Sequence, residues 1–151
     1  MKNLKAIDKI IAYSSSHDTG AVTAYQSIHT DKENQIRNRR LLAKLMLNDY
    51  RVTSIKGSFF ENHGKPNSKE ISAEIFFVVD LKNKGNLESE LENLGNEFGL
   101  DSILYIPKGS RSKSEFLSNV SFMPFVFSEE ITELKSPTNV MGKWATRLGS
   151  K

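Results

Sequence analysis

Several features are missing from this sequence, and each absence excludes a class of protein. The 151 residues contain no cysteine, which rules out a disulfide-stabilised scaffold and any site that uses a thiolate as metal ligand or nucleophile. No apolar run approaches the roughly 18–20 residues that a membrane-spanning helix needs. Residues 1–13 lack the continuous apolar core and the cleavage site of a signal peptide. We therefore expect a cytoplasmic protein with no membrane partner.

Cofactor and metal motifs are also missing. The chain has no GxxxxGK[ST] phosphate-binding loop and no GxGxxG dinucleotide fingerprint, so we expect no cofactor. His17, His29 and His63 lie far apart in the sequence, and none has a partner at the short spacing that metal sites often show. The sequence therefore predicts no metal site.

The composition is that of a globular domain. Hydrophobic residues make up 38% of the chain, charged residues make up 26%, and the formal net charge is +3. A chain of this length suits one domain and can bury a proper core. The last segment, residues 135–151, has basic residues but no acidic ones. We expect a single domain over residues 1–134, followed by a basic tail, 135–151, that does not pack fully.

Hydrophobic periodicity predicts a succession of helices and strands. Leu87, Leu91 and Leu94 recur at helical spacing. Thr30, followed three residues later by Glu33, is a capping-box pattern that begins a helix. The predicted helices cover residues 1–11, 31–48 and 86–98. The predicted strands cover residues 21–28, 51–60, 71–81 and 102–106, with a bulge at Gly57 in the second of them. A basic loop is expected over residues 108–114, followed by an extended segment over residues 116–127.

The order of these elements predicts a fold. Between residues 21 and 106 the order is strand, helix, strand, strand, helix, strand, which matches the split βαβ arrangement of ferredoxin-like folds. We therefore predict an α+β protein with a ferredoxin-like βαββαβ core, an N-terminal helix and an extra C-terminal strand. Both core helices would cover one face of the sheet. The uncovered edges of so small a sheet would allow a homodimer.

Basic residues are concentrated in two segments. Arg37, Arg40 and Lys44 are three and four residues apart, so they are expected to share one exposed helix face. Lys108, Arg111 and Lys113 lie in the basic loop. Such groups can bind phosphates or another polyanionic partner. The alternative is an ordinary solvated helix face, paired in part with the acidic helix at 86–98.

Two further places could serve a function. Glu61 and His63 follow the end of a predicted strand and are weak candidates for a general base or acid. The alternative is a polar hairpin loop, since no partner nucleophile is identifiable. Trp144, the only tryptophan, lies in the basic tail, where it would either anchor a partner or dock on the protein's own core.

Several short motifs give the chain a family resemblance. They are Ala24-Tyr25, Glu33-Asn34, Asn38-Arg39-Arg40, Gly57-Ser58-Phe59-Phe60-Glu61-Asn62-His63-Gly64, Glu74-Ile75-Phe76-Phe77-Val78-Val79 and Asp101-Ser102-Ile103-Leu104. Over about residues 21–106 the chain resembles an uncharacterised family of short bacterial and bacteriophage proteins. The resemblance implies a phage or mobile-element context, with the host-cell cytoplasm as the location. It carries no activity with it.

Three functions remain open from the sequence. The first is a small phage-like accessory protein that binds a host protein or a nucleoprotein complex without catalysis. The second is a nucleic-acid-binding protein that uses the basic helix face. The third is a small enzyme that acts on a nucleotide or a phosphate ester through Glu61 and His63. The sequence favours the non-enzymatic alternatives because it shows no catalytic constellation.

Overall fold

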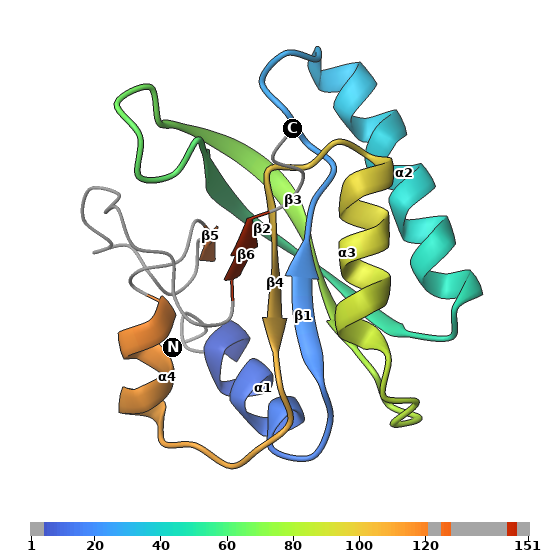
Figure 1. Ribbon diagram of the computed structural model, residues 1–151, viewed down its shortest axis with the longest axis vertical. Coiled ribbons are helices and arrows are strands. Elements are labelled where there is room, and N and C mark those ends of the chain that lie inside the picture. Colours follow the sequence, from blue (N-terminus) through green and yellow to red (C-terminus); the bar gives the residue numbers. More distant parts are fainter. Residues whose placement is uncertain (1–4, 121–124, 128–144, 148–151) are drawn as a thin grey trace.

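The protein has an α+β fold built on one antiparallel sheet (Figure 1). The computed structural model describes residues 5–120, 125–127 and 145–147. Four strands form the centre of the sheet in the order β2–β3–β1–β4; they are β1 (Thr19–Val22), β2 (Arg51–Glu61), β3 (Lys69–Val79) and β4 (Ser102–Ile106). With the helix α2 (Asp31–Leu47) after β1 and α3 (Leu87–Glu97) after β3, these strands form the predicted ferredoxin-like βαββαβ core.

Short strands extend both edges of this sheet. β5 (Phe125–Phe127) pairs with β2, and β6 (Ala145–Arg147) pairs with β4. β5 is the predicted extra C-terminal strand at an edge. β6 comes from the segment predicted as a tail; the domain boundary at residue 134 itself stays a prediction. Trp144 lies outside the described residues.

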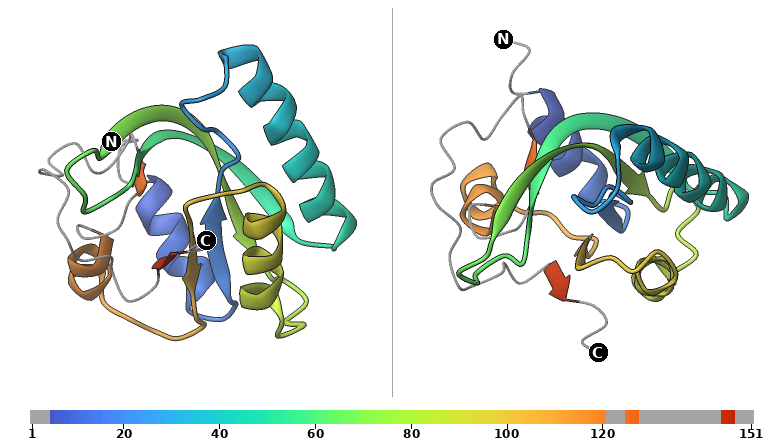
Figure 2. Two further views of the ribbon diagram at one scale, coloured as in Figure 1. Left: turned by 45° about the horizontal axis from the view of Figure 1, so that its top comes forward. Right: turned by 90° about the horizontal axis from the view of Figure 1, so that it is seen from above.

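Helices cover both faces of the sheet (Figure 2). α2 and α3 lie on one face, where Leu41 of α2 and Leu91 of α3 join one buried apolar cluster. α1 (Lys5–Ser14) and α4 (Lys113–Val120) lie on the other face, where Ile10 and Phe116 join a second cluster. No helix in the described part of the chain is long and apolar enough to cross a membrane.

Strand β3 shows why both faces are covered. Its residues alternate, so that Ile75 and Phe77 belong to the cluster under α1 and α4, whereas Phe76 and Val78 belong to the cluster under α2 and α3. All four side chains are buried. The sequence predicts this coverage, because apolar residues in the second half of the strand fall on both of its faces, and the structure confirms it.

The helix ends also follow the sequence signals. At the start of α2, the Thr30 hydroxyl accepts the Glu33 N–H and the Glu33 carboxylate accepts the Thr30 N–H, which completes the predicted capping box. At the end of α3, Gly99 adopts a positive φ of 69°. The Leu100 N–H then reaches the Gly95 carbonyl at 2.8 Å and closes the helix, because glycine adopts this conformation at little cost.

Three local predictions are wrong. The strand expected over residues 21–28 ends at Val22, because helix α2 supplies the hydrogen-bond partners of the following segment, as described below. The bulge expected at Gly57 is absent, since the β2–β3 register runs unbroken through Gly57 and Ala73. The spacing of Met46 with Leu41, Leu42 and Leu45 predicts that it shares their buried stripe, but Met46 is 60% exposed.

The segment expected to be extended from residue 116 begins instead with helix α4. The Ser112 hydroxyl accepts the Glu115 N–H at 3.1 Å, which is a helix N-cap. Phe116 is fully buried against the sheet. The Phe116 ring therefore packs a helix, not a strand, against the core. Within the described part of this segment, only Phe125–Phe127 are extended.

Candidate functional site

A sizeable cavity lies between α2 and the strands β2 and β3. Its volume is about 890 Å³, which lies within the usual range for a small-molecule site. The lining residues come from four segments: Tyr25; Asp31, Gln35, Arg39 and Leu42 of α2; Ser54, Lys56 and Gly57 of β2; and Ser72, Ala73, Glu74 and Phe76 of β3.

The cavity results from the polar first half of α2. Four α2 residues are buried: Asn34, Asn38, Leu41 and Leu45. Leu41 and Leu45 pack in the apolar core, whereas Asn34 and Asn38 make hydrogen bonds instead of apolar contacts. The sheet side of the cavity carries a pair of opposite charges beside apolar Phe76, since Lys56 lies directly opposite Glu74 in the β2–β3 ladder.

Glu74 is held firmly at the centre of this lining. Its Oε2 accepts the Ser54 hydroxyl at 2.6 Å, and its Oε1 accepts the Asn38 amide Nδ2 at 3.3 Å. Its main-chain carbonyl accepts the Thr23 hydroxyl at 2.7 Å and the same Asn38 amide at 2.9 Å. A strand neighbour, a helix and the end of β1 therefore fix both the backbone and the carboxylate of this residue.

Tyr25 supplies an aromatic ring at the same cavity. Burial raises the pKa of the Tyr25 phenol above its usual value, and the negative charges of Glu74 and Asp31 raise it further. The phenol thus stays neutral at physiological pH and can donate a hydrogen bond.

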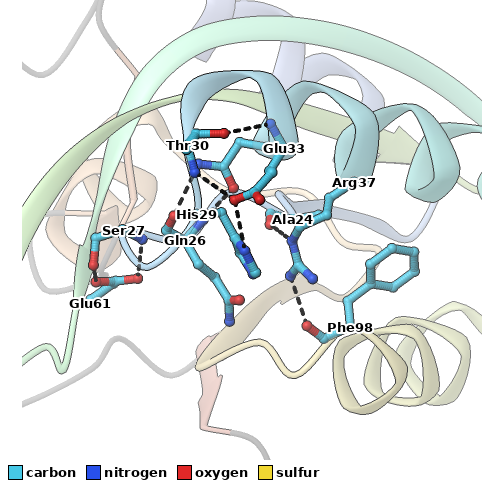
Figure 3. A network of polar contacts seen from close by, with 10 residues as sticks. Ala24, Gln26, Ser27, His29, Thr30, Glu33, Arg37, Glu61 and Phe98 are labelled. Carbon is cyan, nitrogen blue, oxygen red and sulfur yellow. Dashed lines mark hydrogen bonds and ion pairs between the residues drawn. The ribbon is translucent and has the colours of Figure 1, made fainter.

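The segment after β1 that carries Tyr25 is fastened to α2 by side chains (Figure 3). Asn34 accepts the Gln26 N–H at 2.9 Å and donates to the Gln26 carbonyl at 3.0 Å. Arg37 donates from Nε to the Ala24 carbonyl at 2.9 Å and from Nη2 to the Phe98 carbonyl at 2.8 Å. These contacts replace the strand pairing that the sequence pattern predicted for this segment.

The structure does not bring the predicted basic residues together on one surface. Arg37 is half-buried, so the prediction that it shares an exposed face with Arg40 and Lys44 is wrong. Its guanidinium lies 5.8 Å from the centre of the Phe98 ring, and burial, with the charge of Arg40, lowers its pKa. Lys44 pairs with Glu97 of α3 at 2.9 Å, which is the alternative that the sequence left open.

The second basic group lies on the other side of the sheet. Lys113 of α4 pairs with Asp8 of α1 at 3.3 Å. Arg111 donates to the Pro107 carbonyl at 2.9 Å, and the main-chain N–H of Lys108 donates to Asp18 at 2.8 Å. A role of these residues in binding a polyanion or a partner stays a prediction.

Glu61 and His63 lie outside the cavity lining. The Glu61 carboxylate accepts the Ser27 N–H at 2.9 Å and the Ser27 hydroxyl (Figure 3). His63 is 3% exposed, and its ring centre lies 5.9 Å from that of Phe60. These surroundings are typical of a hairpin turn packed on its own strand, and the catalytic role of the pair stays a prediction.

The comparison with known proteins identifies the family. The sequence profile of the S-adenosylmethionine lyase family matches residues 20–146, which is most of the chain. The chain belongs to this family. The matched region takes in the ferredoxin-like core from Gly20 onward and every residue that lines the cavity. No curated protein and no solved structure matches the chain.

Membership of the S-adenosylmethionine lyase family changes the order of the functions considered from the sequence. It fits the enzyme option among the three alternatives, which the sequence described as a small enzyme acting on a nucleotide or a phosphate ester, and gives no support to a phage accessory protein that only binds. The bacterial or bacteriophage origin implied by the resemblance stays a prediction. Among the described residues, no group of three or more histidine, aspartate or glutamate side chains is placed to hold a metal ion.

The sequence did not single out the cavity residues as a site. Four of the motifs behind the resemblance contribute residues to the cavity lining: Ala24-Tyr25, Asn38-Arg39-Arg40, the motif that begins at Gly57 and the motif that begins at Glu74. A usable signal was present in β3, where Glu74 is the one carboxylate between Ile71 and Val79. A charged residue next to the fully apolar stretch Ile75–Val79 of the same strand indicates a site or a fixed partner.

Proposed function

We propose that this protein cleaves S-adenosylmethionine in the cavity under α2, by a lyase reaction that consumes no water. The observation that carries the proposal is a cavity of suitable volume that combines the fixed carboxylate of Glu74, the aromatic ring of Tyr25 and the cations Arg39 and Lys56. The family supplies the substrate and the reaction type. The cavity supplies chemistry that suits both.

The reaction needs little help from an acid or a metal. When a carbon–sulfur bond of the sulfonium breaks, the bonding pair passes to sulfur, which leaves as a neutral thioether. The carbon fragment then completes its valence in one of two ways: its own carboxylate oxygen bonds to that carbon and closes a ring, or a proton is lost from the adjacent carbon to a base and a double bond forms. Positive charge disappears at sulfur in the transition state, so apolar surroundings disfavour the sulfonium more than they disfavour the transition state. Leu42 and Phe76 supply such surroundings.

The same reasoning assigns the charged residues to the amino-acid end of the substrate. A carboxylate beside the sulfonium would stabilise the ground state more than the transition state and would slow the reaction. We therefore place the substrate ammonium at Glu74 and the substrate carboxylate at Arg39 and Lys56. Arginine and lysine are the usual partners of a carboxylate. The zwitterionic end of the substrate would then be fixed while the sulfonium faces the apolar lining.

The nucleoside end has suitable partners as well. The neutral Tyr25 ring can stack on the adenine, and aromatic stacking on a base contributes about 1–3 kcal/mol in other systems. Asp31 can accept hydrogen bonds from the ribose hydroxyls, which are donors. These contacts would orient the molecule along the cavity, and fixed orientation is a main source of catalysis when no strong acid or base is needed.

The direct test is product analysis in ¹⁸O-labelled water. Purified protein is incubated with S-adenosylmethionine, and the products are identified by mass spectrometry. We expect a thioether and a carbon fragment whose masses sum to that of the substrate, with no ¹⁸O incorporated during the enzymatic step. Incorporation of one ¹⁸O atom in that step would indicate hydrolysis, and an unchanged substrate would contradict the proposal.

The site is tested by two matched substitutions in β3. Glu74→Gln removes the charge but keeps an oxygen for the Asn38 amide, so we expect kcat/KM to fall by about 100-fold or more, as for loss of a buried charge-assisted contact. Glu70→Gln is the control, because Glu70 lies on the same face of β3 and also accepts a serine hydroxyl of β2, from Ser58, but is not part of the cavity lining. Equal effects of both substitutions would remove Glu74 from the site.

A further inference from the structure

Asn38 occupies an unusual place for a helix residue. It lies in the middle of α2 and is only 1% exposed. Asparagine is a poor helix former in such a position, and a buried amide is costly unless its donors and acceptor are satisfied. Its Oδ1 accepts the Ala24 N–H at 2.8 Å, and its Nδ2 donates to both the carbonyl and the carboxylate of Glu74.

Its neighbour Asn34 shows what a purely structural amide does in the same helix. Asn34 is 4% exposed and lies one turn earlier. Both arms of its amide bind main-chain atoms of a single residue, Gln26. Asn38 also binds the main chain, but it alone of the two reaches the side chain of a residue that lines the cavity.

We propose that Asn38 is a positioning residue that, together with Ser54, holds the Glu74 carboxylate in the orientation that receives the substrate. The inference rests on the function proposed above and adds to it the device that orients its central group. Asn38 holds one carboxylate oxygen from the helix, and Ser54 holds the other from strand β2. Since both donors come from packed elements, the carboxylate is already in place before a ligand arrives. Such preorganisation supports rate more than affinity.

The informative substitution is Asn38→Asp, which is nearly isosteric. At about pH 8 the new carboxylate still accepts the Ala24 N–H, but it repels Glu74 instead of donating to it. We expect kcat to fall by about 100-fold through misplacement of Glu74, with KM changed by less than about threefold. On acidification, the carboxylates at positions 38 and 74 of the variant share one proton. The resulting O–H···O hydrogen bond replaces the one that the Asn38 amide donates in the wild type. We therefore expect the ratio of variant to wild-type kcat to rise at least tenfold by about pH 5.

Asn34→Asp is the matched control. It places the same new charge in the same helix at similar burial, but it disturbs only the contact with Gln26. A loss of stability without a change in the shape of the pH profile is expected for this control. A parallel rise on acidification in both variants would assign the effect to general strain in α2 and would overturn the proposal.

A readout that needs no activity separates this inference from the proposed function. In crystal structures at about pH 8, we expect the Glu74 carboxylate to remain within hydrogen-bond distance of Ser54 in the wild type and in Asn34→Asp, and to leave it in Asn38→Asp because of charge repulsion. A carboxylate that stays in place in Asn38→Asp overturns the positioning role even if the enzyme is active. An inactive wild type with the expected displacement would refute the proposed function alone.

Ser54→Ala keeps the inference falsifiable if Asn38→Asp does not fold. Ser54 is exposed, so its loss does not disturb the core, and it removes only the second donor to Glu74. Loss of one hydrogen bond to a charged group corresponds to about a tenfold or greater fall in kcat, again with a small change in KM. An unchanged kcat in Ser54→Ala would contradict the proposal.

Discussion

Helices α2 and α3 cover the same face of the same sheet, yet they meet it in different ways. The inward side of α3 is apolar and consists of Leu87, Leu91, Leu94 and Gly95. The inward side of α2 is apolar only in its second half, at Leu41 and Leu45, and carries amides in its first half, at Asn34 and Asn38. Helix α3 therefore packs against the sheet along its whole length and completes the apolar core. Helix α2 does so only in its second half, and its first half lines a polar cavity.

Packing at strand β1 shows how closely α3 approaches the sheet. A Cβ added at Gly20 would lie 2.6 Å from the Leu91 side chain and 2.5 Å from the Leu104 carbonyl of β4. Only glycine fits such a position. The cavity under α2, by contrast, has room for a ligand of nucleoside size. Stability is therefore expected to depend on α3, and function on the first half of α2.

The largest effect on stability is expected from Leu91→Ala. Leu91 is fully buried between α3 and the sheet, and a Leu→Ala change in such a core costs about 3 kcal/mol, within a range of 2–5. Urea unfolding followed by circular dichroism measures this cost. Gln35→Ala, in the cavity half of α2, is the counterpart and is expected to change stability by less than about 0.5 kcal/mol. Similar losses in both variants would break the comparison between the two helices.

A smaller effect is expected from Thr30→Ala at the start of α2. The substitution removes the hydroxyl that accepts the Glu33 N–H, and loss of an N-cap costs about 1 kcal/mol. Because α2 also supports the cavity, we expect activity to fall at temperatures where the first turn opens, before global unfolding. Thermal unfolding and activity are to be measured on the same samples. If activity is lost at the same midpoint temperature as global unfolding, the first turn of α2 does not open separately and this prediction is contradicted.

The effect seen over the narrowest range of conditions is expected from the tyrosines near α3, because it is confined to alkaline pH. Burial raises the pKa of Tyr105 to about 12, and hydrogen bonding to Asp18 contributes further. The folded state thus keeps the phenol protonated where the unfolded chain, with a pKa near 10, loses its proton. The free energy of unfolding should therefore be unaffected by this group below about pH 10 and should fall between about pH 10 and 12.

Tyr105→Phe provides the control for this alkaline loss. The variant lacks the phenol, so its free energy of unfolding should fall less steeply above pH 10 than that of the wild type. Burial and a hydrogen bond from Tyr50 to Glu90 also raise the pKa of Tyr50, so part of the loss should persist. Identical pH dependence in wild type and variant would contradict the closed packing inferred on the α3 side.

Much of the fold could be predicted from the sequence because its signals are local. The leucines of α3 repeat at helical spacing, the residues of β3 alternate, and Thr30 with Glu33 marks the start of α2. Helix α4 was missed because the aromatic residues from Phe116 onward outweighed the Ser112–Glu115 cap, which is the same kind of signal.

The site could not be predicted in the same way, because its residues are distant in sequence. Tyr25, Arg39, Lys56 and Glu74 come together only through the β2–β3 register and the packing of α2. A polar residue such as Asn38 in an amphipathic helix is ordinarily expected on the solvent side. Its burial, and the contacts that it makes with Glu74, depend on tertiary structure alone.

The central claim is that the cavity under the first half of α2 is the place where substrate binds. The most direct measurement is a crystal structure of the Glu74→Gln variant soaked with S-adenosylmethionine well above its KM, since this variant should turn the substrate over slowly. We expect density for S-adenosylmethionine along the cavity, with the amino-acid end of the ligand near position 74 and its adenine near Tyr25. Ligand density elsewhere, for example at Glu61 and His63, would contradict it.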